Sequence, residues 1–362
     1  MNKKIVRICC VIMVLSLLML SFTACKDKEN YQKVDSTVPS STEEPTTEEP
    51  TPTNVNPLTG LADLSESAIG ARPIAIMVEN SPAARPQWGL SSPDIVLEGV
   101  VEGGITRMMW IYADVAKVPK IGPVRSARHD YVEIAAGMNA IYAHWGGSPQ
   151  AYDTIKNLGM KDIDGMDYGN KYFFKDSSRT GRGTEHAGYT NGEYLTSAIS
   201  ARGIDTKAKD SNWMPFTVIS NGERVSFGES SGSCSEVTVE FSSSYRHTFK
   251  YNAEDKLYYN YMNSSEMKDG NNDETMAVTN VIIMYCPTKT LDEKGRQDWD
   301  LSSGDAVYIS NGHGESISWK KGSATSPLKF YGKDGKELTV NKGQTWIGVV
   351  PEANRGKTTV KS

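Results

Sequence analysis

The sequence predicts an α+β protein, in which an N-terminal α/β domain with a mixed sheet flanked by helices is followed by a mostly antiparallel β domain. Within residues 56–212, apolar runs of strand length alternate with helical segments that carry cap residues at their ends. Within residues 213–362, short stretches alternate apolar and polar residues and are separated by turn residues. Residues 1–55 show neither pattern, so we expect the globular part to begin at residue 56.

Residues 1–25 have the composition of a secretory signal. Basic residues precede an apolar run from Ile8 to Phe22, and small residues follow it up to Cys25. This run is short for a spanning helix, which needs about 20 residues. Small residues before a cysteine resemble a bacterial lipobox, although Phe22 stands where leucine is usual. We therefore expect cleavage before Cys25, lipid on that residue and attachment to the outer face of the cell membrane; an uncleaved membrane anchor is the alternative.

Residues 26–55 are rich in Thr, Glu, Pro and Ser and nearly lack apolar residues. Such a segment cannot bury enough surface to offset its chain entropy, so we expect a disordered tether. The net charge of −5 gives no reason to expect a nucleic acid as partner. Beyond residue 25 the cysteines are Cys234 and Cys286. They could form a disulfide or remain as free buried thiols, and the sequence leaves both possibilities open.

The stretch from Ile121 to Leu158 is predicted to form a helix, a strand, a glycine turn and a second helix. Ser126 is a good N-cap for a helix over 127–136, and residues 140–145 form a short apolar run of strand type. Ser148 can cap the next helix, with Pro149 at its first position. The other elements expected in this half are strands at 74–78, 94–102 and 106–112, a hairpin turn at 103–104 and a helix from 190 or 191 to 201.

Free N–H groups at two helix N-termini, together with nearby cations, would form an anion site. Arginine supplies paired donors suited to phosphate or carboxylate. The alternative is that the arginines form ion pairs with Asp94, Glu98 or Glu102 and fasten helix to sheet. A glycine-broken loop further along adds Arg179 and His186. The candidate ligand-binding residues are Arg125, Ser126, Arg128, His144, Gly146, Gly147, Ser148, Arg179 and His186.

Other kinds of site are less well supported by the spacing of residues. The histidines lack His-x-x-x-His spacing and the cysteines lack Cys-x-x-Cys spacing, so we expect no metal and no cofactor. A hydrolase using Ser148 or His186 remains an alternative, although Ser148 does not lie in a Gly-x-Ser-x-Gly motif. Glu98 and Glu102 would lie about 13 Å apart on a strand, which is too far for a glycosidase pair.

The second half is predicted to be almost entirely β. Asn252–Asp255 should turn one hairpin, whose tyrosine-rich strands could form a surface for a protein partner. The expected strands lie at 216–219, 237–241, 248–251, 256–261, 278–285, 306–309, 315–319, 328–331, 337–340 and 345–350.

Several longer motifs resemble the YerB family of bacterial lipoproteins. They are NPLTGL, RPIAIMVEN, RPQWGLSSPDIVLEGVVEGGITR, IGPVRSARHDYVEIA and AHWGGSPQAYD in the first half, and DAVYIS, ISWKK and GQTWIGVVP in the second. The segment RTGRGTEHAGY departs from the shorter stretch that the family tends to have, and within it Arg179 and His186 match. The resemblance implies a two-domain envelope lipoprotein and supplies no catalytic residues.

Together these observations predict a membrane-tethered, extracytoplasmic protein that is not an enzyme. Its first domain would bind an anionic or polar envelope ligand, such as a cell-wall glycan or peptide bearing phosphate or carboxylate. The alternatives are an envelope hydrolase, or a scaffold that regulates cell-wall enzymes through its β domain.

Overall fold

The computed structural model describes residues 54–168, 170–220, 224–228 and 231–362. The predicted signal peptide, Cys25 and the predicted tether up to residue 53 lie outside the described residues. No helix in the described part of the chain is long and apolar enough to span a membrane.

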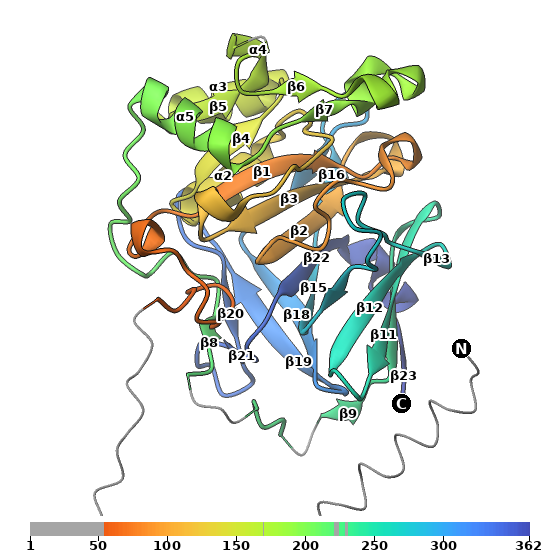
Figure 1. The fold of residues 1–362 in the computed structure, drawn as a ribbon. Coiled ribbons are helices and arrows are strands. Elements are labelled where there is room, and N and C mark those ends of the chain that lie inside the picture. Colours follow the sequence, from red (N-terminus) through yellow and green to blue (C-terminus); the bar gives the residue numbers. More distant parts are fainter. Residues whose placement is uncertain (1–53, 169, 221–223, 229–230) are drawn as a thin grey trace, which may run out of the picture. The chain divides into compact units, whose positions relative to one another are not determined.

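Strands from both halves of the sequence form one large mixed sheet (Figure 1). Its order is β20-β19-β18-β15-β22-β2-β3-β1-β4-β5, with β9 paired to β19, which makes 11 strands. The N-terminal half supplies β1 (Ile74–Glu79), β2 (Ile95–Val100), β3 (Thr106–Tyr112), β4 (Ile141–His144) and β5 (Asp162–Asp164). The C-terminal half supplies β9 (Gly232–Ser233), β15 (Asn280–Cys286), β18 (Ser303–Ser310), β19 (His313–Lys320), β20 (Lys329–Tyr331) and β22 (Thr345–Pro351).

The two halves meet where β2 and β22 pair in parallel, from Ile95 opposite Thr345 to Gly99 opposite Val349. This pairing was not predicted, because the strand patterns of the two halves give no register between them. Parallel pairs β1–β4, β4–β5 and β15–β22 stand beside antiparallel pairs such as β2–β3 and β18–β19. The mixed sheet in the first half and the mainly antiparallel second half confirm the predicted α+β class.

A smaller antiparallel sheet packs within the second half, in the order β13-β12-β11-β10-β23, with β14 paired to β12. Its strands alternate buried and more exposed residues, as the sequence pattern predicts. They are β10 (Glu236–Ser242), β11 (Tyr245–Asn252), β12 (Leu257–Met262), β13 (Ser265–Glu266), β14 (Ala277–Val278) and β23 (Thr359–Lys361). Three two-stranded pairs complete the β structure: β6 (Phe174–Lys175) with β7 (Gly188–Tyr189), β8 (Thr217–Val218) with β21 (Thr339–Val340), and β16 (Thr288–Thr290) with β17 (Gln297–Trp299).

Alternate side chains of β1 enter two different cores. Ala75 and Met77 pack in the core that contains residues of α2 (His129–Gly137) and α3 (Pro149–Asn157). Ile74 and Ile76 pack in the core that contains residues of α5 (Gly192–Arg202) and the smaller sheet. Successive side chains of a strand point to opposite faces, so both faces of the large sheet are covered here. This explains why β1, β2 and β3 are buried along their whole length and consist largely of apolar residues.

Two helix starts were predicted correctly and one was wrong. Ser148 accepts a hydrogen bond from the Ala151 amide and caps α3, and Asn191 likewise caps α5. Ser126, however, caps no helix: α2 begins at His129, with Arg128 at its N-cap and no side-chain cap bond. The backbone before α2 is instead tied to neighbouring segments, since the Ala127 amide donates to the Gly146 carbonyl at 2.8 Å.

Remaining short elements are α4 (Gly165–Tyr168) and the 3₁₀ turns η1 (Glu66–Ala68), η2 (Pro82–Ala84), η3 (Glu102–Gly104), η4 (Val115–Lys117), η5 (Ser177–Arg182), η6 (Thr184–His186) and η7 (Glu352–Lys357). The glycine hairpin predicted at 103–104 is present: both glycines have positive φ, at 68° and 71°, which favours glycine. Cys234 and Cys286 are both buried and free, so the structure selects two thiols over the disulfide.

Candidate functional site

Arg128 fastens helix to sheet, which is the alternative that its sequence position left open. Its Nε donates to Glu102 Oε2 at 2.9 Å, and a second guanidinium nitrogen pairs with Oε1 of the same carboxylate. Arg107 Nη2 lies 3.5 Å from Oε1 of that carboxylate as well. Burial raises the pKa of Glu102, but the hydrogen bond from Arg128 and the charges of both arginines outweigh it and lower this pKa to about 2. Arg128 is therefore occupied by the protein's own carboxylate.

His144 has no surface to offer a ligand, because its side chain is fully buried. Its Nε2 lies 2.9 Å from Asp162 Oδ2 and its Nδ1 lies 2.8 Å from the Gly146 carbonyl oxygen. Arg202 binds the other oxygen of Asp162 at 2.9 Å. The ring thus joins β4 to β5 and to the glycine turn, and it fixes the backbone instead of contacting solvent.

The predicted amide cradle at the start of α3 is also occupied. The Gly146 amide donates to Asp164 Oδ1 at 2.8 Å, and the Ser148 amide donates to the Ala127 carbonyl at 3.2 Å. The Ser148 hydroxyl is buried and accepts the cap bond described above. Gly147 lies against the Tyr152 ring, and a Cβ at this glycine would lie only 3.2 Å from the ring. Sequence alone could not show these partners, because the fold brings Asp164, at the end of β5, and Ala127, in the segment before α2, to the turn.

Arg179 is a structural residue in the loop before α5. It is 7% exposed, donates to the Ala84 carbonyl at 2.9 Å and stacks over the Trp88 ring at 3.7 Å. A second bond reaches the Pro86 carbonyl. These contacts hold the loop that follows η2, and they leave the guanidinium facing protein atoms. Ser126 is similarly engaged, since its hydroxyl donates to the Trp145 carbonyl at 3.2 Å.

Arg125 and His186, by contrast, come together from distant segments. Both approach Glu79 at the end of β1: Arg125 Nε lies 3.5 Å from Glu79 Oε2, and His186 Nδ1 lies 2.9 Å from the same oxygen. Arg125 also donates to the Glu185 carbonyl at 3.4 Å. The Arg125 side chain is about one-quarter exposed, at 26%. Of the nine candidates, Arg125 lines an open hollow, and His186 is not among the residues that line it.

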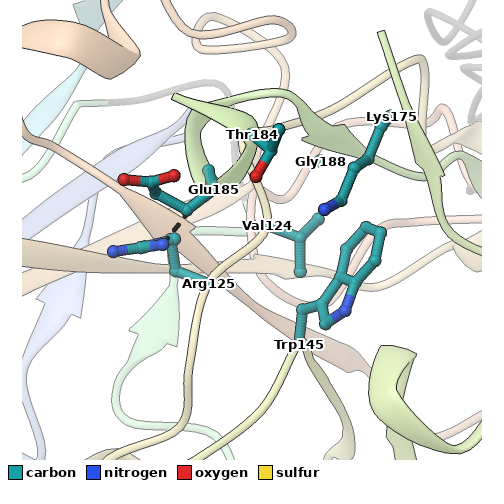
Figure 2. A pocket seen from close by; sticks show the side chains of 7 residues that line it. All are labelled: Val124, Arg125, Trp145, Lys175, Thr184, Glu185 and Gly188. Atoms are coloured by element: carbon teal, nitrogen blue, oxygen red, sulfur yellow. Dashed lines mark hydrogen bonds between the residues drawn. The ribbon is translucent and has the colours of Figure 1, made fainter. Parts of the chain in front are cut away.

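That hollow is shown in Figure 2 and has a volume of about 190 Å³. Figure 2 shows the Lys175 side chain reaching over Trp145, while Arg125 and Glu185 lie on the other side of Val124. The lining residues come from the segment before α2, the end of β4, the β6–β7 pair and η6; they are Val124, Arg125, Trp145, Lys175, Thr184, Glu185 and Gly188. Hereafter this hollow is called the Arg125 pocket.

Electrostatically, the Arg125 pocket combines cations with one carboxylate. A backbone hydrogen bond to its own amide, together with the charges of His186, Arg125 and Lys175, lowers the pKa of the exposed Glu185. The Lys175 ammonium lies 5.8 Å from the Trp145 ring centroid, and no ion pair to it is formed by the described carboxylates. The pocket can thus offer two positive donors, one acceptor and an aromatic face.

Gly188 shapes the wall of the Arg125 pocket. A Cβ at this position would lie 2.9 Å from the Trp145 ring, which is closer than real Cβ contacts allow. Glycine therefore lets the indole lie against β7. Sequence reasoning missed Lys175, Thr184 and Gly188, because nothing in their spacing links them to Arg125. Among the described residues, His129, Asp130 and Asp298 form a group that could hold a metal ion, and none of them lines this pocket.

Two family models match the chain. The N-terminal domain of a protein of unknown function (DUF3048) matches residues 58–205, and the C-terminal domain of the same description matches residues 237–347. A relative from Bacillus subtilis (strain 168) named "Putative lipoprotein YerB" is 31% identical over 304 residues, which cover 82% of this chain and 86% of the relative. A crystal structure of YerB protein from Bacillus subtilis is similar with a TM-score of 0.70 at 28% identity, and the match covers 84% of this chain and 99% of that chain. The chain therefore belongs to the YerB family and carries both DUF3048 domains.

Proposed function

We propose that this protein is an extracytoplasmic lipoprotein, anchored through lipid on Cys25, that binds a small carboxylate-bearing envelope ligand in the Arg125 pocket. The ligand class we propose is the charged end of a cell-wall peptide. The anchor is supported by the signal-like N-terminus and by the name of the Bacillus subtilis relative. The ligand is supported by the side chains of the pocket.

The observation that carries the proposal is the pair of cations, Arg125 and Lys175, on one small hollow. Arginine and lysine donors suit a carboxylate, and arginine can engage it with two N–H groups. Arg125 Nε makes no hydrogen bond to the described residues, and its contact with Glu79 is long at 3.5 Å. Glu79 thus positions the guanidinium, and its terminal nitrogens, not the buried Nε, would donate to a ligand.

Glu185 favours a zwitterion over a phosphate. Its exposed carboxylate stands at the same hollow and would repel a doubly charged phosphate, but it can accept from an amino group. A peptide end that carries a carboxylate and a nearby amine can pair the carboxylate with Arg125 and Lys175 and the amine with Glu185. Trp145 supplies an apolar face for the carbon atoms between them.

An envelope hydrolase receives less support from the geometry. The Ser148 hydroxyl is buried and accepts the cap bond of α3, and His186 is paired with Glu79 and Glu185. A serine nucleophile needs a base within hydrogen-bond distance, and no hydrogen bond joins Ser148 to His186 among the described residues.

Titration calorimetry on the full chain in detergent tests the proposal. The ligand is a cell-wall stem peptide with a free C-terminal carboxylate, compared with the same peptide amidated at that end. Arg125→Ala and Lys175→Ala should each weaken binding by about tenfold, because a charged hydrogen bond contributes about 1.5 kcal/mol. Lys171→Ala, which removes a lysine outside the pocket, is the matched control and should bind like the unmodified protein.

Two results would count against this proposal. One is binding of the amidated peptide as tightly as the free acid, which would mean that the carboxylate is not recognised. The other is an equal loss in the Lys171→Ala control, which would point to a general charge effect.

A further inference from the structure

His129, Asp130 and Asp298 bring three metal-ligating side chains together between α2 and β17. His129 Nε2 lies 2.9 Å from Asp298 Oδ1 and 3.3 Å from Asp130 Oδ1, and the three ligand atoms lie within 4.8 Å of one another. Zinc-type ions hold nitrogen and oxygen ligands at about 2.0–2.2 Å, so adjacent ligands in one coordination shell are about 3–3.5 Å apart. We propose that these three residues bind a divalent transition-metal ion.

The 2.9 Å distance between His129 Nε2 and Asp298 Oδ1 suits a hydrogen bond as well as two ligands of one metal ion. The surroundings of Asp130 supply the second argument. This carboxylate is 3% exposed; it accepts a hydrogen bond from the Trp299 amide at 2.9 Å, and its Oδ1 lies 3.3 Å from His129 Nε2. A bound dication would stabilise the charged form of this buried acid.

The contacts around the cluster leave coordination positions available. Lys289 Nζ pairs with Asp298 Oδ2 at 3.0 Å, which leaves Oδ1 directed to His129. The Trp299 amide fixes the Asp130 carboxylate, as outer hydrogen bonds commonly do for metal ligands. An open hollow of about 420 Å³ lies beside the cluster and gives a hydrated ion access; it is lined by Pro287, Thr288, Lys289, Asp298 and Asp300. Water from this hollow can complete the coordination shell.

The ligand set indicates which metal to expect. One imidazole nitrogen with two carboxylate oxygens suits zinc or manganese, whereas calcium and magnesium prefer oxygen alone. Two carboxylate ligands would supply negative charge to a bound dication. Because His129 and Asp298 are 169 residues apart, no spacing motif could have revealed them. The ion would join a helix of the first half to a strand of the second.

Metal binding is tested on the full chain in detergent after treatment with EDTA. Zn²⁺ is titrated by calorimetry, and Co²⁺ is added separately because its visible absorption reports the coordination geometry. We expect one ion per chain. Asp298→Asn and His129→Gln should each weaken binding by about 10- to 100-fold. Asp300→Asn removes a carboxylate from the same hollow, outside the cluster, and should leave the affinity unchanged.

Three results would overturn the proposal: no Zn²⁺ binding by the unmodified protein, an undiminished affinity in both cluster variants, or an equal loss in Asp300→Asn. Circular dichroism of each variant shows that a loss does not come from unfolding. If His129→Gln fails to fold, Asp298→Asn decides the question alone, because Asp298 is the more exposed ligand at 29%.

Discussion

The ion pair between Arg128 and Glu102 shows that the role of an arginine depends on the carboxylate that the fold places beside it. Arginine near a helix start matches both an anion site and an internal ion pair, and the sequence offered both. The structure places Arg128 on a carboxylate from the β2–β3 turn, with 11% of its side chain exposed. Arg125, three residues earlier, keeps its donors at the pocket. The difference lies in which carboxylate the fold brings near each guanidinium.

We expect Arg128→Met to lower the free energy of unfolding by about 2 kcal/mol at pH 7, since it leaves Glu102 partly buried without its main partner. Because the pKa of Glu102 is lowered to about 2, its contribution is present above the ordinary pKa of 4.5 and is lost as the pH falls through 2. As the pH falls from about 4.5 to about 2, the free energy of unfolding should therefore decrease less in the variant than in the unmodified protein. Urea unfolding at several pH values measures both effects.

Lys357→Ala is the control for this prediction. Its pair with Glu240 is at the surface, with Lys357 51% exposed, so its removal should cost less than about 1 kcal/mol. An equal decrease in the free energy of unfolding in the two variants would show that the Arg128 ion pair stabilises the fold no more than an exposed surface ion pair does. Peptide binding by Arg128→Met should be unchanged, because Arg128 does not line the Arg125 pocket.

At the scale of elements, the β6–β7 pair determines one wall of the Arg125 pocket. Lys175 ends β6 and Gly188 begins β7, so the pairing of these two short strands places a cation opposite the indole of Trp145. Neither strand was predicted, because two residues give no periodic pattern. The longer elements were predicted because their signals are local: alternation along a strand, or a cap residue and proline at the start of α3.

Gly188→Ala should lower the free energy of unfolding by about 1–3 kcal/mol, because the added methyl group collides with the Trp145 ring. It should also weaken peptide binding, since the ring must shift into the pocket. Gly181→Ala is the matched control: it lies in the preceding loop, and a Cβ there would meet nothing within 4 Å. Thermal unfolding compares the two variants. A Gly188→Ala protein as stable as the control would show that the indole is not held against β7.

At the scale of the whole molecule, local patterns predicted most strands and could not predict which strands would meet. The helix caps at Ser148 and Asn191 were confirmed, and so was the fold class. The parallel pairing of β2 with β22, the Lys175 side of the pocket and the contact of His129 with Asp298 all join residues far apart in the chain. Patterns within a single sequence do not record such contacts, so the division of the chain at residue 212 stays a prediction.

The shared sheet predicts that the described part of the chain unfolds as one unit, although two family models match it. Separating the halves would expose the edge of β2 and the buried residues Leu97 and Ile347, which face each other across the seam. Calorimetry of the full chain should therefore show a single transition with equal calorimetric and van't Hoff enthalpies. A fragment of residues 54–212 alone should show no cooperative transition, because it lacks the strand that covers β2. Two separate transitions in the full chain, or a fragment that melts as sharply as the full chain, would mean that the seam between β2 and β22 couples the halves only weakly.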